Sequence, residues 1–180
     1  MKKKPNVKRI PQIWTIGHST RTIEEFIRLL NEYKIEMVLD VRHYPNSRHF
    51  PHFNRDRLAQ SLAAAGIGYE HLVELGGRRN ANPDSHNLAW RNSAFRGYAD
   101  YMETQPFAAG IKRLLEFALS RRCALMCAEA VWWRCHRSLL SDYFKSHGAT
   151  VLHILGANKV QEHPYTTAAK IVNGKLSYEK

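Results

Sequence analysis

The chain has 180 residues, 44% hydrophobic and 24% charged, which is the balance of one globular domain long enough to bury a core. No apolar run approaches the roughly 20 residues that span a membrane, and the basic N-terminal tail at 1–11 lacks the apolar core of a signal peptide. The three cysteines favour a reducing, cytoplasmic location over a disulfide framework, and the formal net charge of +11 favours a nucleotide or nucleic acid as partner.

Five apolar runs predict β-strands, and the capped or amphipathic segments between them predict helices. Three of the runs are almost continuously apolar, which is typical of parallel strands buried on both faces. The sequence therefore predicts a three-layer α/β/α domain with a mainly parallel sheet of about five strands. In chain order, the predicted strands are 13–18, 37–42, 67–75, 123–129 and 150–155, and the predicted helices are 22–34, 54–66, 95–105, 107–121 and 137–148.

Local signals support these bounds. Thr22 and Glu25 have the spacing of a helical capping box, and Gly66 and Gly148 follow predicted helices as C-terminal glycines. The pair Asn173-Gly174 between alternating residues predicts a type I′ β-hairpin.

Two longer stretches fall outside the predicted α/β pattern. Segment 76–94 is rich in Gly, Asn, Ser and Arg, and we expect an exposed loop that covers the site or orders on binding. Segment 157–180 forms a C-terminal extension that contains the hairpin. No linker or repeat divides residues 1–180, so the sequence predicts a single domain.

Polar and small residues gather where the predicted strands end. Ligands of open α/β sheets bind beyond the carboxyl ends of the strands, because loops and helix N-termini converge there. The sequence therefore predicts one site at this edge. The strand-end residues are His18, Ser19, Asp40, Arg42, Gly76, Gly77, Arg78, Cys127 and Glu129.

The segment 127–137 places a second cysteine at the start of a predicted helix. Free N–H groups and the helix dipole at such an N-terminus favour an anion or a thiolate. Cys135 is therefore the better nucleophile, with Glu129 or His136 as proton carrier and Arg137 as anion ligand. The alternative is plain packing, since free cysteine is among the most buried residue types.

A cationic loop follows the second strand, within residues 40–57. It interleaves arginines and histidines with aromatic residues, as single-stranded nucleic-acid grooves do. Ser47 and Arg48 are its candidate anion ligands, and Asp40 would orient a histidine, bind a metal or hold a ribose hydroxyl. A loop packed through its aromatics, with solvated arginines, explains the pattern equally well.

A metal centre is a further alternative. Its ligands would be His18, Cys127, Cys135 and His136, although their spacing differs from that of paired-cysteine zinc sites. Nothing in the sequence requires a cofactor. If the protein has one, these residues would suit a divalent metal. A thiol redox role would require Cys127 and Cys135 to approach disulfide distance.

Short motifs run through almost the whole chain. They are TIGHS at 15–19, DVR at 40–42, PNSR at 45–48, FN at 53–54, Y at 69, LGG at 75–77, FRGYADYM at 95–102, CAE at 127–129, CHR at 135–137, HPY at 163–165 and GKLSY at 174–178. Together they resemble the family called domain of unknown function 488. The resemblance implies a small three-layer α/β domain but no particular reaction. It also implies that one site contains His18, Asp40, Arg42, Glu129, Cys135, His136 and Arg137.

These observations lead to one functional hypothesis and two alternatives. We expect an enzyme, a hydrolase or transferase, that acts on a phosphorylated or anionic substrate such as a nucleotide or nucleic acid. The first alternative is a non-catalytic nucleic-acid-binding module, in which arginines contact phosphate and aromatic rings stack on bases. The second is a metal-binding or thiol redox protein.

Overall fold

The computed structural model describes residues 12–180, so the basic tail predicted at 1–11 lies outside the described residues. Within the described residues, eight strands form a main sheet and a small hairpin. The strands are β1 (Gln12–Gly17), β2 (Met37–Asp40), β3 (Gly68–His71), β4 (Cys123–Cys127), β5 (Thr150–Gly156), β6 (Lys159–Glu162), β7 (Lys170–Val172) and β8 (Lys175–Ser177). The helices are α1 (Ile23–Glu32), α2 (Arg55–Ala64), α3 (Ser93–Tyr101), α4 (Gln105–Ala118) and α5 (Arg137–Ser146).

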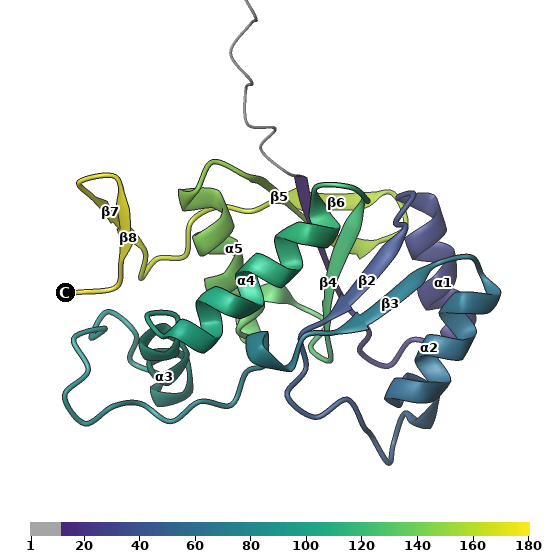
Figure 1. Ribbon diagram of the computed structural model, residues 1–180, viewed down its shortest axis with the longest axis horizontal. Coiled ribbons are helices and arrows are strands. Elements are labelled where there is room, and N and C mark those ends of the chain that lie inside the picture. The colour runs from purple at the N-terminus through teal and green to yellow at the C-terminus, as the bar shows by residue number, and fades with distance from the viewer. Residues whose placement is uncertain (1–11) are drawn as a thin grey trace, which may run out of the picture.

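The main sheet has the strand order β3-β2-β4-β1-β5-β6 (Figure 1). The first five of these strands are parallel to one another, and β6 pairs antiparallel with β5. The central strand β4 is buried at all five positions, as its uninterrupted apolar sequence predicts.

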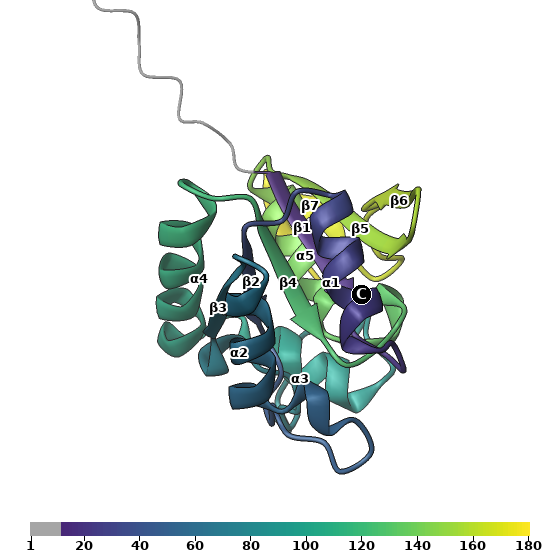
Figure 2. The ribbon, with the colours of Figure 1, turned by 90° about the vertical axis from the view of Figure 1, so that its right-hand side faces the viewer.

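Helices cover both faces of the sheet, which makes the three predicted layers. Helices α1 and α2 lie on one face and α4 and α5 on the other (Figures 1 and 2). Each face has its own hydrophobic core. Phe26 of α1 and Leu58 of α2 pack in one core, and Leu114 of α4 and Leu139 of α5 pack in the other.

The chain reverses direction across the sheet between β1 and β4. Strand β1 leads through α1 to β2, on the far side of β4, whereas β4 leads through α5 to β5, on the far side of β1. Because α1 and α5 lie on opposite faces, the two connections diverge and leave a crevice at the carboxyl ends of β1 and β4. In open α/β sheets this switch point is where ligands bind.

The predicted strands and helices are all present, although β2 and β4 each end two residues before their predicted bounds. Two larger differences affect the sheet. The predicted strand 67–75 is shorter, because β3 ends at His71 and a 3₁₀ turn, Val73–Leu75, follows it. The sheet also has a sixth strand, β6. Its sequence KVQE is mostly exposed at the sheet edge, so it carries none of the apolar pattern by which buried strands are recognised.

The predicted end signals are confirmed. Thr22 and Glu25 exchange both hydrogen bonds of the capping box before α1. Gly66 and Gly148 follow α2 and α5 with φ of 74° and 86°. Asn173 also has a positive φ in the two-residue turn between β7 and β8, where the hairpin was predicted.

The segment between the 3₁₀ turn at Val73–Leu75 and α3 contains no helix or strand, and most of its residues are exposed or half-buried. It is nevertheless anchored. Asn87 is buried and donates to the carboxylates of Asp100 and Glu103, and the N–H of Ala89 donates to the carbonyl of Tyr178. The loop is thus tied both to α3 and to the C-terminal extension.

None of the helices within residues 12–180 is both long and apolar enough to cross a membrane.

Gly17 sets how closely β1 approaches the loop after β4. A Cβ at this position would lie 1.8 Å from the carbonyl oxygen of Glu129, a backbone atom that cannot move without shifting the loop. We expect Gly17→Ala to lower the free energy of unfolding by about 1–3 kcal/mol, measured by urea denaturation. The matched control is Gly156→Ala, whose Cβ would meet nothing within 4 Å. Equal stability of the two variants would contradict this packing.

Candidate active site

A cleft of about 570 Å³ opens at the switch point. Its walls come from the loops that follow β1, β2 and β4 and from the turn before α5. The residues that line it are His18, Ser19, Thr20, Arg42, Tyr44, Asn46, Ser47, Phe50, Gly77, Arg78, Cys127, Ala128, Glu129, Ala130, Cys135 and His136.

Two cysteines meet in the wall of the cleft. Cys127 is the last residue of β4, and Cys135 lies between a 3₁₀ turn, Trp132–Arg134, and α5. Their Sγ atoms are 3.0 Å apart, and both side chains are buried, Cys135 with 7% of its surface exposed. The intervening loop is anchored by the buried indole of Trp132.

Cys135 lies in a setting that favours the thiolate. The backbone N–H of Arg137 donates to its Sγ at 3.3 Å, and Nε of Arg137 donates at 3.2 Å. Burial acts to raise the pKa of Cys135, but the hydrogen bond from Cys127, the charge of Arg137 and the neighbouring His136 outweigh it and hold this pKa well below its ordinary value. Burial and the same sulfur contact raise the pKa of Cys127. Cys127 is therefore the thiol that donates, and Cys135 the thiolate that accepts.

Arg42 supplies positive charge on the opposite side of the cleft. Asp40 holds it in a fork, with Nε 2.9 Å from Oδ1 and Nη2 2.6 Å from Oδ2. Tyr69 donates a further hydrogen bond of 2.7 Å to Asp40. Burial would lower the pKa of Arg42, but the hydrogen bonds and charge of Asp40 outweigh it and raise the pKa. The guanidinium thus stays charged and fixed in direction at the cleft wall.

His18 is a buried neutral base that lines the cleft beside Arg42. Its Nδ1 donates to the carbonyl of Ser19 at 3.0 Å, which leaves Nε2 as an acceptor 3.5 Å from Nη1 of Arg42. The ring stacks on Phe53 with centroids 4.2 Å apart. Burial, followed by the charge of Arg42, lowers the pKa of His18 from 6.5 to about 4. At neutral pH this ring therefore orients Arg42 without adding a charge.

His136 is the second histidine that lines the cleft. Its Nε2 lies 2.9 Å from the carbonyl oxygen of Val41, which can only accept, so Nε2 carries the proton and Nδ1 is the acceptor. A Cβ on Gly77 would come within 2.8 Å of that Nδ1. Glycine at this position therefore lets the backbone pack against the imidazole, where any side chain would collide with it.

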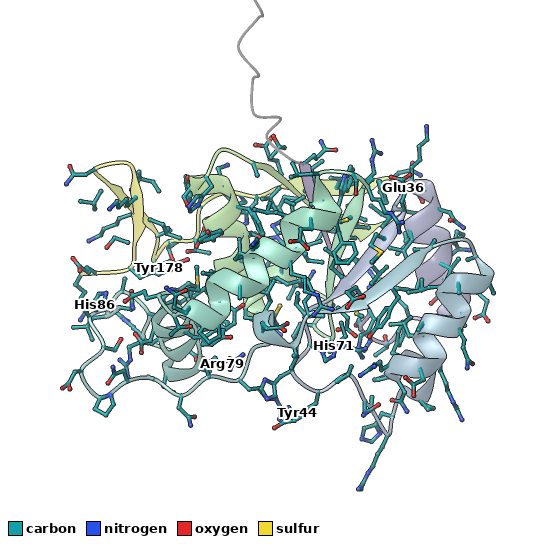
Figure 3. The ribbon with its side chains drawn as sticks, viewed as in Figure 1. Glu36, Tyr44, His71, Arg79, His86 and Tyr178 are labelled. Carbon is teal, nitrogen blue, oxygen red and sulfur yellow. The ribbon has the colours of Figure 1, made fainter. Side chains whose placement is uncertain are left out.

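The outer rim of the cleft combines a cation with an aromatic ring. Tyr44 is 64% exposed, and the guanidinium of Arg78 lies 5.6 Å from the centre of its ring. Figure 3 shows Tyr44 projecting outward on the side of the molecule where Arg79 also lies. A planar, electron-rich ligand could stack here while an arginine contacts its anionic group.

Behind the thiolate, a chain of buried hydrogen bonds crosses the protein. Nη1 of Arg137 lies 3.3 Å from Oγ1 of Thr15, which lies 2.7 Å from Nδ1 of His153. Nε2 of His153 lies 2.9 Å from Nδ1 of His163, whose Nε2 lies 2.9 Å from Asp142. All five side chains are at most 1% exposed.

The two ends of this chain carry opposite charges. Arg137 can only donate, and the Asp142 carboxylate, which also accepts from Thr166 and Tyr178, can only accept. Burial, then the charges of His163 and Arg137, lowers the pKa of His153 to about 2. The chain thus links a buried cation to a buried anion through hydrogen bonds, which satisfies both.

The cleft brings together most of the residues that the sequence indicated, and it places others behind its wall or outside it. His18, Ser19, Arg42, Ser47, Gly77, Arg78, Cys127, Glu129, Cys135 and His136 line it. Asp40 and Arg137 are buried behind it, where they hold Arg42 and Cys135. Arg48 faces a neighbouring shallow pocket, and Gly76 packs against the backbone of His43.

The set His18, Cys127, Cys135 and His136 does not form a metal centre in the structure. Within residues 12–180, no group of three or more His, Cys, Asp or Glu side chains has an arrangement that could hold a metal ion. One ring nitrogen of each histidine is already bonded to a backbone carbonyl.

Sequence reasoning missed the buried chain behind Cys135. Its members come from β1, β5, α5 and the C-terminal extension, so no single motif contains them. The one local signal is His153, an ionisable residue within the apolar strand TVLHIL. It indicates a buried histidine that needs partners, but not which residues those are.

The fold and the cleft together define a three-layer α/β domain with a buried thiolate and fixed guanidinium groups at its topological switch point. Residues 22–144 match the family described as domain of unknown function DUF488, and the chain belongs to this family. No curated protein and no solved structure matches the chain. The matched residues include both cysteines of the cleft but not His18, His153 or His163.

The thiolate assignment predicts how Cys135 reacts with alkylating agents. Since its pKa lies well below the ordinary value, we expect the rate of Cys135 modification by iodoacetamide to rise much less between pH 6 and pH 8 than the rate of an ordinary thiol does. The measurement is peptide mass spectrometry after timed quenching, with Cys123→Ser as the matched control. A rate that rises about tenfold per pH unit over this range would show an ordinary thiol.

The buried neutral histidines predict acid sensitivity. The pKa of His153 in the folded protein lies below its unfolded value of 6.5, so between these values the unfolded chain binds more protons and stability falls as the pH falls. At pH 5 the loss is about 2 kcal/mol for this residue. His153→Gln keeps one donor and one acceptor without titrating, so we expect the loss between pH 7.5 and pH 5 to shrink by about that amount in urea denaturation. Substitution of the exposed His49 by Gln should leave the loss unchanged; the same shrinkage there would contradict the assignment.

Proposed function

We propose that this protein is an enzyme, a hydrolase or transferase, that uses the Cys135 thiolate to attack a substrate bearing a phosphate or similar anion. The observation that carries the proposal is the Cys135 sulfur, which accepts two hydrogen bonds from Arg137 in the wall of a cleft that Arg42 and Arg78 also line. A thiolate is a far stronger nucleophile than a thiol, and here the N-terminus of α5 and the guanidinium of Arg137 stabilise it. A protein that only binds nucleic acid has no need of such a group.

Two arginines support the choice of an anionic substrate. Arg42 is rigid, because Asp40 fixes it, and within residues 12–180 its hydrogen bonds leave N–H groups on Nη1 and Nη2 for a ligand. Arg78 is exposed at the rim and free to adapt to the ligand. A fixed inner cation would position the reacting group, and an outer one would capture the substrate.

Two side chains at the cleft, His136 and Glu129, would transfer protons in this reaction. Nδ1 of His136 is the acceptor that would take a proton from an attacking water when the covalent intermediate on Cys135 is released. Glu129 is exposed at the cleft edge, and its side chain would exchange protons with the leaving group. Attack by sulfur forms the new S–P or S–C bond as the bond to the leaving group breaks, and water then restores the thiolate.

A nucleotide or nucleic acid is the substrate that we favour within this class. The net charge of +11 attracts polyanions, Tyr44 offers an exposed ring beside Arg78, and about 570 Å³ is enough space for a nucleotide. The free cysteines fit a reducing compartment, and a cytoplasmic location is part of this proposal.

The test is a screen of nucleotides and short single-stranded oligonucleotides for turnover, with intact mass spectrometry to trap an adduct on Cys135. We expect Cys135→Ser and Glu129→Gln to abolish or strongly slow turnover while the dissociation constant stays within about threefold. Arg78→Gln should weaken binding about ten- to a hundredfold, since a lost charge-assisted hydrogen bond contributes about 1.5–3 kcal/mol.

The matched control is Arg91→Gln, which removes the same charge from an exposed position in the same loop but outside the cleft. If Arg78→Gln and Arg91→Gln weaken binding equally and no substrate turns over, the protein is a nucleic-acid-binding module instead. Turnover that persists in Cys135→Ser would remove the nucleophile from the proposal.

A further inference from the structure

Beyond its hydrogen bond to the Cys135 sulfur, Cys127 has no role in the proposed nucleophilic reaction. Cys127 does not hold a substrate anion, and its raised pKa makes it a poor nucleophile at neutral pH. It is buried, yet its Sγ lies 3.0 Å from that of Cys135. A disulfide bond is about 2.05 Å long, so a shift of about 1 Å would join the two sulfurs.

We propose that Cys127 is a resolving thiol, which captures an oxidised Cys135 in a reversible intramolecular disulfide. The oxidant would be a small hydroperoxide that enters the cleft. The inference rests on the proposed function only through the reactive sulfur of Cys135. It adds a redox activity that a nucleophilic mechanism does not require.

The reaction has two balanced steps. In the first, the Cys135 thiolate attacks the terminal oxygen of the hydroperoxide; an S–O bond forms, the O–O bond breaks, and the departing alkoxide or hydroxide takes a proton from water. In the second, the Cys127 sulfur attacks the sulfenic sulfur of Cys135; the S–S bond forms, the S–O bond breaks, and hydroxide leaves with the Cys127 proton as water. A small dithiol then returns both thiols and is itself oxidised.

The surroundings of the two sulfurs favour the second step. Once Cys135 is a neutral sulfenic acid, the negative sulfur that helps to keep Cys127 protonated is gone, whereas Arg137 remains beside both residues. Arg137 then stabilises negative charge on Cys127 as that sulfur attacks. Oxidation of one cysteine therefore activates the other.

The remaining cysteine cannot compete. Cys123 begins β4 and Cys127 ends it, and four residue steps along a strand separate their Cα atoms by about 13 Å. Cys123 is also buried away from the cleft, in the core that contains α4 and α5. It therefore serves as an internal reference thiol.

The test treats the full chain with equimolar hydrogen peroxide, denatures it, and alkylates the remaining thiols before peptide mass spectrometry. For the natural sequence we expect a Cys127–Cys135 disulfide, with only Cys123 alkylated and complete reversal by dithiothreitol. Cys127→Ser should instead hold Cys135 as a sulfenic acid that a cyclic 1,3-dione traps, and sulfinic acid should form about tenfold faster. Cys123→Ser is the matched control and should form the same disulfide.

The outcomes separate the two proposals. If the dione traps Cys135 equally in the natural chain and in Cys127→Ser, the resolving role is wrong while the reactive thiolate stands. If peroxide modifies Cys135 in neither protein, both the resolving role and the activated nucleophile are wrong. Circular dichroism of Cys127→Ser, with Cys127→Ala as a second variant, shows that each result comes from folded protein.

Discussion

The guanidinium of Arg137 is the buried charge around which the site is built. It is 1% exposed, so its burial is costly unless every direction around it carries a partner. The structure supplies three: the Cys135 sulfur, the Glu129 carbonyl at 2.5 Å, and Thr15 at 3.3 Å. These contacts offset the cost of burying the cation. They also fix the positions of the Cys135 sulfur, the loop after β4 and strand β1 relative to one another.

Charge compensation at this position extends well beyond the cleft. The bond to Thr15 continues through His153 and His163 to Asp142, which also accepts from Tyr178 near the C-terminus. The tail is therefore part of the support of the site. Figure 3 shows Tyr178 far from the rim residue Tyr44, so this support comes from a different part of the molecule than the ligand-facing groups. Each hydrogen bond in this chain fixes the orientation of the next side chain, from Arg137 to Asp142.

The two proposals place different demands on the same pair of sulfurs. Attack on an anionic substrate needs Cys135 ionised and Cys127 as its hydrogen-bond donor, whereas capture of a sulfenic acid needs Cys127 to become the nucleophile. One arrangement serves both, because Arg137 stabilises whichever sulfur carries the negative charge. A disulfide between Cys127 and Cys135 would block the nucleophile until a dithiol reduced it. Peroxide would therefore inhibit the proposed attack on the anionic substrate.

The amino-acid sequence by itself determined the layers, the elements and the edge of the sheet where the polar residues fall, because apolar periodicity, capping residues and turn glycines are local properties. It also singled out Cys135, since a cysteine before a helix is visible along the chain. Only the tertiary structure decided which side chains face the cleft: Asp40 and Arg137 lie behind it, while His18 and Arg42 lie side by side in its wall. It alone placed Cys127 against Cys135 and joined Thr15 to the C-terminal tail, because strand order, which no local pattern encodes, sets the distances between residues remote in sequence.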